Sequence, residues 1–260
     1  MGYGYKFKFE LNFAIRYILL IFLLMQFFIS CSNDAAPDCF KSAGAATSYE
    51  VPVADFTAIN ISEGIELIIT EGAETKVVIE TGENLKNNIS AEVIGSELYL
   101  KNNTGCNWVR DYNTTRIYVT TPALTKIYSA SQFAVKSDGV LHFPQLALQS
   151  GLFGETASGT FELQVDCVSL SVEDNQSAYF VISGNAHNLN VSFYSGDARF
   201  EGSNLMVNNV HVFHRSSNDI IVKPQQQVSG TLYSTGNLVL KNQPPVVNVE
   251  RLYTGQVIYQ

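Results

Sequence analysis

Two histidines three residues apart, His211 and His214, are the first candidates for chemistry, because pairs of imidazoles commonly bind metal ions. They stand in VHVFH, a short run typical of a β-strand. Side chains alternate between the two faces of a strand, so a spacing of three directs these imidazoles to opposite faces. The pair therefore cannot chelate one ion, and His214 is expected in the core. We predict no metal site and no cofactor.

The acidic residues do not form the pair that glycoside hydrolysis requires, which is two carboxylates about 5–9.5 Å apart. Glu173 and Asp174 are adjacent, and adjacent side chains of a strand face opposite ways. We expect these acids, like the others of the second half, in solvated turns. The sequence contains no GxSxG, Walker, dinucleotide-binding or HExxH motif. We predict no catalytic residues and no enzymatic activity.

Residues suited to recognition gather in one irregular segment, NNTGCNWVRDYNTT, at positions 102–115. Trp108, Arg110 and Tyr112 are residue types that anchor ligands and protein partners. Long loops are either functional or structural covers, so this segment is either a binding loop or a cap that folds over the end of the domain.

A second candidate surface consists of Tyr128, Phe213 and Tyr233, which occupy equivalent outward positions in the first, fifth and sixth of the repeating predicted strands. Exposed aromatic rings on a flat sheet can bind a linear polymer. The alternative is that a loop covers them.

The N-terminus has the pattern of a secretory signal. Basic residues precede the uncharged run YILLIFLLMQFFI at positions 17–29, which is short for a membrane-spanning helix. Phe28-Ile29-Ser30-Cys31 resembles a bacterial lipobox, with Phe28 where leucine is more usual. Residues 1–30 are thus predicted to be a lipoprotein signal peptide and Cys31 the lipidated first residue. An uncleaved signal anchor, and a cysteine that follows an ordinary signal, are the alternatives.

Residues 31–50 read as a flexible tether, and their loosely acidic start is similar to the export tags of some surface lipoproteins. After removal of residues 1–30 the chain has 13 basic and 23 acidic residues, a net charge of −10. Nucleic-acid partners are therefore not expected, because phosphates attract a basic surface. The membrane is the expected partner, through lipid on Cys31. We predict an outer-membrane lipoprotein of the bacterial envelope that is exposed at the cell surface.

Three other cysteines would meet an oxidising compartment. Cys39 and Cys106 both lie in polar, loop-like stretches and are a candidate disulfide. Cys167 adjoins an apolar strand and is expected to be a buried thiol.

Residues 51–260 alternate apolar and polar residues in short runs rich in valine, isoleucine, tyrosine and threonine, which indicates a single all-β domain. Residues 51–120 form an N-terminal β part, a meander or cap. In residues 121–260 the pattern recurs at intervals of 21, 22, 21, 21 and 20 residues, at the positions Ile127, Leu148, Leu170, Val191, Val212 and Leu232.

A recurrence near 21 residues is about one coil of a β-helix, whose rungs bury their inner faces only against neighbouring rungs. We therefore predict a right-handed parallel β-helix-like solenoid in which Leu148, Leu170 and Val191 stack directly. An antiparallel β-sandwich or barrel is the alternative architecture.

The stretch from FTAINIS to ELYLKN resembles the opening of the auto-transporter adhesin family named for its head GIN domain. The matching features are Ile61, the residues Gly64-Ile65-Glu66, the Gly72 turn, Val77 to Glu80, and the strand from Leu98 to Lys101. Glu66 stands where that name would place asparagine. The resemblance implies a β-helix-like fold in envelope lipoproteins, and it implies no catalytic residues.

The expected function is non-enzymatic adhesion or ligand binding at the cell surface, with a glycan or a protein as the ligand. Many anchored copies would give avidity to weak single contacts. Two alternatives stay open, a polysaccharide-acting enzyme or accessory protein, and a structural envelope protein.

Overall fold

The computed structural model describes residues 42–105, 115–153 and 157–260, and almost all of these lie in one compact unit. The described elements are strands and one short 3₁₀ helix, η3 (Glu83–Asn88). The strands of the first part are β1 (Ala46–Val51), β2 (Ala58–Ile61), β3 (Glu66–Glu71), β4 (Lys76–Gly82), β5 (Ile89–Ile94), β6 (Glu97–Asn102) and β7 (Arg116–Thr121). Those of the second part are β8 (Lys126–Ser129), β9 (Val135–Leu141), β10 (Gln145–Ser150), β11 (Thr160–Asp174), β12 (Tyr179–Phe193), β13 (Arg199–His214), β14 (Ile220–Leu232), β15 (Leu238–Leu240), β16 (Val246–Arg251) and β17 (Val257–Tyr259).

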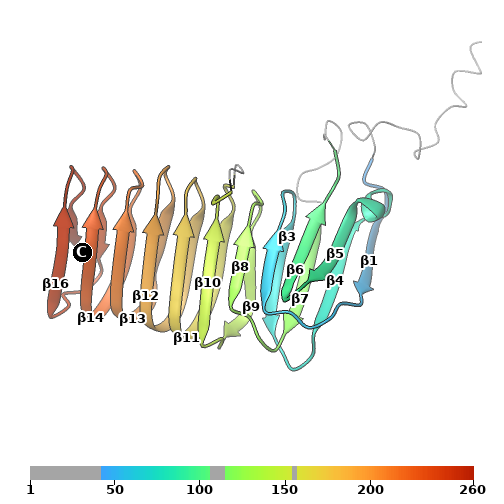
Figure 1. The fold of residues 1–260 in the computed structure, drawn as a ribbon, viewed down its shortest axis with the longest axis horizontal. Coiled ribbons are helices and arrows are strands. Elements are labelled where there is room, and N and C mark those ends of the chain that lie inside the picture. The colour runs from blue at the N-terminus through green and yellow to red at the C-terminus, as the bar shows by residue number, and fades with distance from the viewer. Residues whose placement is uncertain (1–41, 106–114, 154–156) are drawn as a thin grey trace, which may run out of the picture. The chain divides into compact units, whose positions relative to one another are not determined.

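The second part is a stack of parallel rungs (Figure 1). Strands β8, β10, β11, β12, β13, β14 and β16 pair in that order, all parallel. The long strands serve two faces of the solenoid: β11 pairs with β9 in its first half and with β10 in its second half. The arrangement is a β-solenoid of about six turns, which confirms the predicted fold class.

The first part joins this stack and then closes it. Strands β2 and β3 pair in parallel with β8 and β9, so they belong to the stack. Antiparallel pairs lie beyond them: β4 with β7, β1 with β4, and β5 with β6. Among the described residues, antiparallel pairing is thus confined to the N-terminal part, where a cap was predicted.

Alternation of apolar and polar residues creates the core, because every second side chain of a strand points inward. In β11 the buried side chains alternate with exposed ones along almost the whole strand. Phenylalanines fill the inside of one corner, where the rings of Phe161 and Phe180 stack with centroids 4.8 Å apart. Each rung buries its inner face against the next rung, so the core is continuous along the solenoid.

The predicted stacking of Leu148, Leu170 and Val191 is wrong by two residues. Leu148 pairs with Val172, which in turn pairs with Val191, whereas Leu170 lies in the row of Leu146 and Leu189. The observed row is Ile127, Leu148, Val172, Val191, Val212 and Gly230, with intervals of 21, 24, 19, 21 and 18 residues. A slip of two keeps each side chain on its face, so the fold was predicted correctly although the register was not.

Candidate functional site

Phe213 contacts both Tyr194 and Tyr233 on the outside of the solenoid, and we refer to these three aromatic side chains as the aromatic cluster. The ring centroids of Tyr194 and Phe213 are 5.7 Å apart, and those of Phe213 and Tyr233 are 4.7 Å apart. Tyr194 is 37% exposed and Tyr233 is 40% exposed. The cluster is therefore a surface feature that the solvent, and a ligand, can reach.

The rungs hold the cluster in place. Phe213 occupies an outward position of β13, in register with Ser192 and Thr231. Tyr194 and Tyr233 directly follow β12 and β14, yet their backbone N–H groups still bind the preceding rung, at Asp174 O (2.9 Å) and His214 O (2.8 Å). The rings are thus presented by hydrogen-bonded backbone, and little conformational entropy would be lost on binding.

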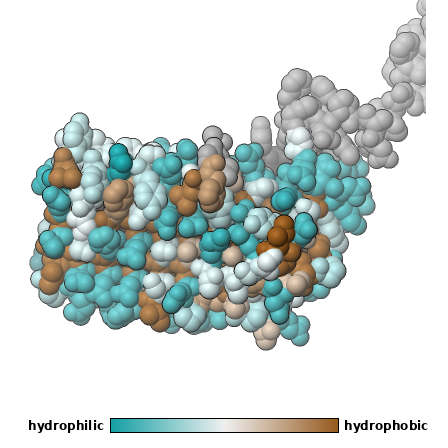
Figure 2. All heavy atoms as spheres, viewed as in Figure 1, coloured by the Kyte–Doolittle hydropathy of each residue, from teal (hydrophilic) through white to brown (hydrophobic). Residues whose placement is uncertain are grey.

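The cluster combines apolar ring faces with polar edges. The Tyr194 hydroxyl donates to Glu173 Oε2 over 3.3 Å. Burial and the nearby Glu173 carboxylate raise the pKa of Tyr194, so its hydroxyl stays protonated at neutral pH. Such a surface can stack against an apolar ligand face while its hydroxyls form hydrogen bonds. Figure 2 shows apolar side chains at separate points, among hydrophilic ones, along the edge where loops leave the strand ends.

Tyr128 does not join this cluster, although it was predicted to form one exposed row with Phe213 and Tyr233. It shares a register row with Phe213, but Gln149, Glu173 and Ser192 lie between them. It is also only 2% exposed, and its ring packs 5.1 Å from that of Phe153.

Sequence reasoning missed two aromatic residues, Phe153 and Tyr194. Phe153 is 74% exposed and borders, with Tyr128, Asn60 and Asn102, a cavity of about 400 Å³. Its position in the glycine-flanked turn GLFG was the available signal, because a large apolar residue in a turn is often exposed or covers a neighbour. Tyr194 ends an apolar run, and only its contact with Phe213 reveals its place in the cluster.

Several predicted site residues lie outside the described residues. These are the candidate lipidation site Cys31, the candidate disulfide Cys39–Cys106, and the loop residues Trp108, Arg110 and Tyr112. Their assignments stay predictions. Cys167 is described, and it is a free, buried thiol whose pKa burial raises to about 11.

The two histidines face opposite ways, as predicted: His211 is exposed and His214 is completely buried. Burial lowers the pKa of His214 to about 4, so the ring is neutral at physiological pH. Among the described residues no group of three histidine, cysteine or acidic side chains is placed to hold a metal ion.

Asp174 corrects the expectation of solvated acids, because its side chain is completely buried. The backbone N–H of Gln176 donates to Asp174 Oδ1 over 2.6 Å, and burial raises the pKa of the carboxyl to about 7. Asp174, Phe193 and His214 are successive members of one register row. The Phe193 ring therefore separates the acid from the imidazole, and the two cannot act as an acid–base pair.

Glu66, the last residue of the Gly64-Ile65-Glu66 segment, forms a charged group with two basic side chains. Glu66 is 6% exposed and accepts from Arg116 Nε (2.8 Å) and Lys136 Nζ (2.9 Å). Hydrogen bonding to Glu66 raises the pKa of both basic groups. A nearly buried carboxylate with two cationic partners is a structural link between neighbouring strands.

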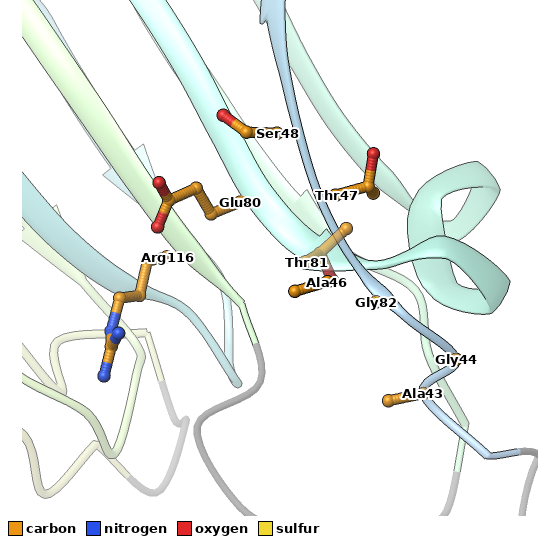
Figure 3. A pocket seen from close by; sticks show the side chains of 9 residues that line it. All are labelled: Ala43, Gly44, Ala46, Thr47, Ser48, Glu80, Thr81, Gly82 and Arg116. Carbon is orange, nitrogen blue, oxygen red and sulfur yellow. The ribbon is translucent and has the colours of Figure 1, made fainter.

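Arg116 also borders a cavity of about 390 Å³ beside β1 and β4. Figure 3 shows that mostly small and hydroxyl side chains line it, with Glu80 as the acid. Glu80 accepts from the Tyr118 hydroxyl over 3.1 Å. Glycoside hydrolysis usually needs two carboxylates, and the described lining of this cavity supplies one, Glu80. The described lining therefore does not form that type of active site.

The fold and the surface together define a β-solenoid protein with an exposed aromatic cluster on a rigid stack of rungs. Within the described residues there is no helix of the length and apolarity needed to cross a membrane. The sequence model of the family described as "putative auto-transporter adhesin, head GIN domain" matches residues 55–244, and the chain belongs to this family.

Solved structures with the same fold come from Bacteroides and Parabacteroides species. A crystal structure titled a putative adhesin from Bacteroides fragilis has a TM-score of 0.75 at 17% identity, and the match covers 84% of this chain and 99% of that chain. Two structures from Parabacteroides distasonis each have a TM-score of 0.63 over 84% of this chain. One is titled a putative lipid binding protein (13% identity, 98% of that chain) and the other a putative adhesin (15% identity, 99% of that chain). No curated protein matches the chain.

Proposed function

We propose that the protein is a non-enzymatic adhesin of the bacterial cell envelope that binds its ligand through the aromatic cluster. The observation that carries this proposal is the contact of Phe213 with Tyr194 and with Tyr233 on the outside of hydrogen-bonded rungs. The family name and the titles of the structural relatives agree with an adhesive role.

A glycan chain is the ligand class that suits the cluster best. The C–H faces of sugar rings can stack on aromatic faces, while Glu173, Ser192 and Thr231 offer hydrogen-bonding groups on the same side. A few such contacts give weak binding. Lipid on Cys31 would hold many copies at one membrane, and multivalent attachment would then become firm.

Binding is best tested with the full chain in detergent micelles on a glycan array. The double variant Tyr194→Ala/Tyr233→Ala should lose about tenfold or more in affinity, because truncating an aromatic anchor commonly costs more than 1 kcal/mol. Met206→Ala is the matched control, since Met206 is 51% exposed on β13 and lies outside the cluster. It should bind like the unmodified protein.

Two outcomes would contradict the proposal. Unchanged binding of the double variant together with a loss in Trp108→Ala would move the site to the 102–115 loop. Release of new reducing ends from the bound glycan would show cleavage, and the protein would then be an enzyme.

A further inference from the structure

The rung formed by β16 and β17 carries an unusual concentration of exposed apolar residues. Eleven large apolar side chains of the described residues are exposed, and five of them fall between positions 246 and 259: Val246, Val247, Leu252, Tyr253 and Tyr259. In Figure 1 this rung stands at the opposite end of the described stack from β1.

Part of this apolar surface is the cross-section of the core itself. Val247 pairs with Val228 and Val249 pairs with Gly230, so both valines continue inward-facing rows. Tyr259 likewise continues the row of Leu240 on the other face. Val247 remains 38% exposed and Tyr259 51% exposed, although the residues below them, Val228 and Leu240, are completely buried.

The backbone of β16 has hydrogen-bonding capacity on the same side. Among the described residues β16 pairs with β14 alone. Leu252 N–H binds Leu232 O, and alternate residues of a parallel strand bind the same neighbour. The N–H groups of Val247 and Val249 therefore point away from β14. An edge with free backbone groups and apolar side chains is a template for another strand.

We infer that β16 is a self-association surface, on which a second copy of this chain docks by antiparallel pairing of β16 with β16. A twofold axis at Asn248 would place Val247 of each copy opposite Val249 of the other. Both residues face inward, so the two cores would become one continuous core. Such an interface is self-complementary and closed, as in the commonest homodimers.

The distribution of charges along β16 favours a second copy of β16 as the docking partner. The segment from Asn242 to Val249 is uncharged, and Glu250 and Arg251 follow it. Antiparallel pairing about Asn248 places Glu250 opposite Val246 and Arg251 opposite Pro245, so no like charges meet. Arg251 Nε donates to Gly255 O over 3.0 Å within its own rung. Pro245 and Arg251 also limit the pairing to a short strand, which opposes the growth of larger assemblies.

The opposite end of the stack is a poorer partner for this edge. Its outer strands β1 and β5 carry charges, with Glu50 bound to Lys76 over 3.2 Å and Glu92 on β5. Head-to-tail stacking would bring these charges against the apolar rung. The isologous pair avoids that cost.

Disulfide trapping tests the geometry directly in the full chain in detergent micelles. Opposed residues of a non-hydrogen-bonded antiparallel pair have Cα atoms about 4.5 Å apart, within the range a disulfide spans. Under mild oxidation Asn248→Cys should therefore yield a reducible dimer that the unmodified chain does not give. Asn190→Cys is the matched control, because Asn190 is an exposed asparagine whose strand is paired on both sides. Equal trapping of both variants, or no trapping of Asn248→Cys, would overturn the inference.

Light scattering during gel filtration supplies the second measurement. The unmodified chain should have the mass of a dimer, and Val247→Lys should raise the dissociation constant by about tenfold or more. Met206→Lys places the same charge on an exposed apolar site outside the rung and should leave the dimer intact. Circular dichroism verifies that each variant is folded. If Val247→Lys is not, Val246→Glu replaces it, because it places a like charge opposite Glu250 of the other copy and should also weaken the dimer. A monomeric unmodified chain, or dimers unaffected by the lysine, would refute the interface.

Discussion

At the scale of the residue, the interior of the solenoid holds two titratable side chains on either side of Phe193. Burial favours the uncharged form of each, which raises the pKa of Asp174 to about 7 and lowers that of His214 to about 4. The protein is therefore expected to lose stability in both directions: as the pH falls, through His214, and as it rises, through Asp174.

Asp174 gives the clearer prediction. Its pKa is raised on folding, so its contribution to stability is complete below pH 3.8 and is lost as the pH rises through about 7. Asp174→Asn removes the ionisation and should be more stable than the unmodified chain at pH 8 and about equal to it at pH 4. The difference at pH 8 should be a few kcal/mol at most. Urea unfolding curves recorded from pH 4 to pH 8 measure it.

Asp166→Asn is the control for this comparison, because Asp166 is an exposed acid of the same strand, β11. If the free energy of unfolding of both variants varies with pH as it does in the unmodified chain, the prediction is wrong. Asp174 then ionises as easily in the folded protein as in the unfolded one.

At the scale of the element, a few glycines allow neighbouring rungs to approach closely. Gly184 has a φ of +104°, and a Cβ atom at this position would lie 2.1 Å from the backbone oxygen of Val165 on the preceding rung. That distance is too short for any side chain, and the backbone conformation is itself strained for other residues.

Gly184→Ala should therefore destabilise the protein by about 2–4 kcal/mol, through backbone strain and overpacking together. Gly95→Ala is the control, since Gly95 also has a positive φ, +66°, but has open space within 4 Å. It should cost about 1 kcal/mol. The midpoint of denaturant unfolding measures the stability of both variants. Equal losses of stability would mean that the close approach of Gly184 to Val165 does not determine the cost of the substitution.

At the scale of the whole molecule, the predicted lipid anchor can be tested in the full chain. Cys31 is the predicted attachment point, and it lies 15 positions before Ala46, where the first described strand, β1, begins. We expect the full chain in a Gram-negative host to incorporate a labelled fatty acid and to partition into detergent, and Cys31→Ala to do neither. Cys39→Ala, which removes a cysteine eight positions later, should behave like the unmodified chain. Labelling that survives in Cys31→Ala would contradict the assignment.

The sequence by itself determined the class of fold and the direction of individual side chains. The alternation in β11 and the recurrence near 21 residues predicted stacked rungs, and the spacing of His211 and His214 predicted that they face opposite ways. These are local properties, because a side chain of a strand can only point to one face or the other.

Only the tertiary structure decided what each side chain contacts. The register of Leu148 with Val172 depends on the length of the turns at each corner, and a repeat of similar rungs tolerates a slip of two residues. Three further contacts follow from that register and from the path of the turns. Phe153 packs against Tyr128, Asp174 is buried, and Tyr194 contacts Phe213. Contacts between rungs join residues about 20 positions apart, and the pattern of a single strand carries no information about them.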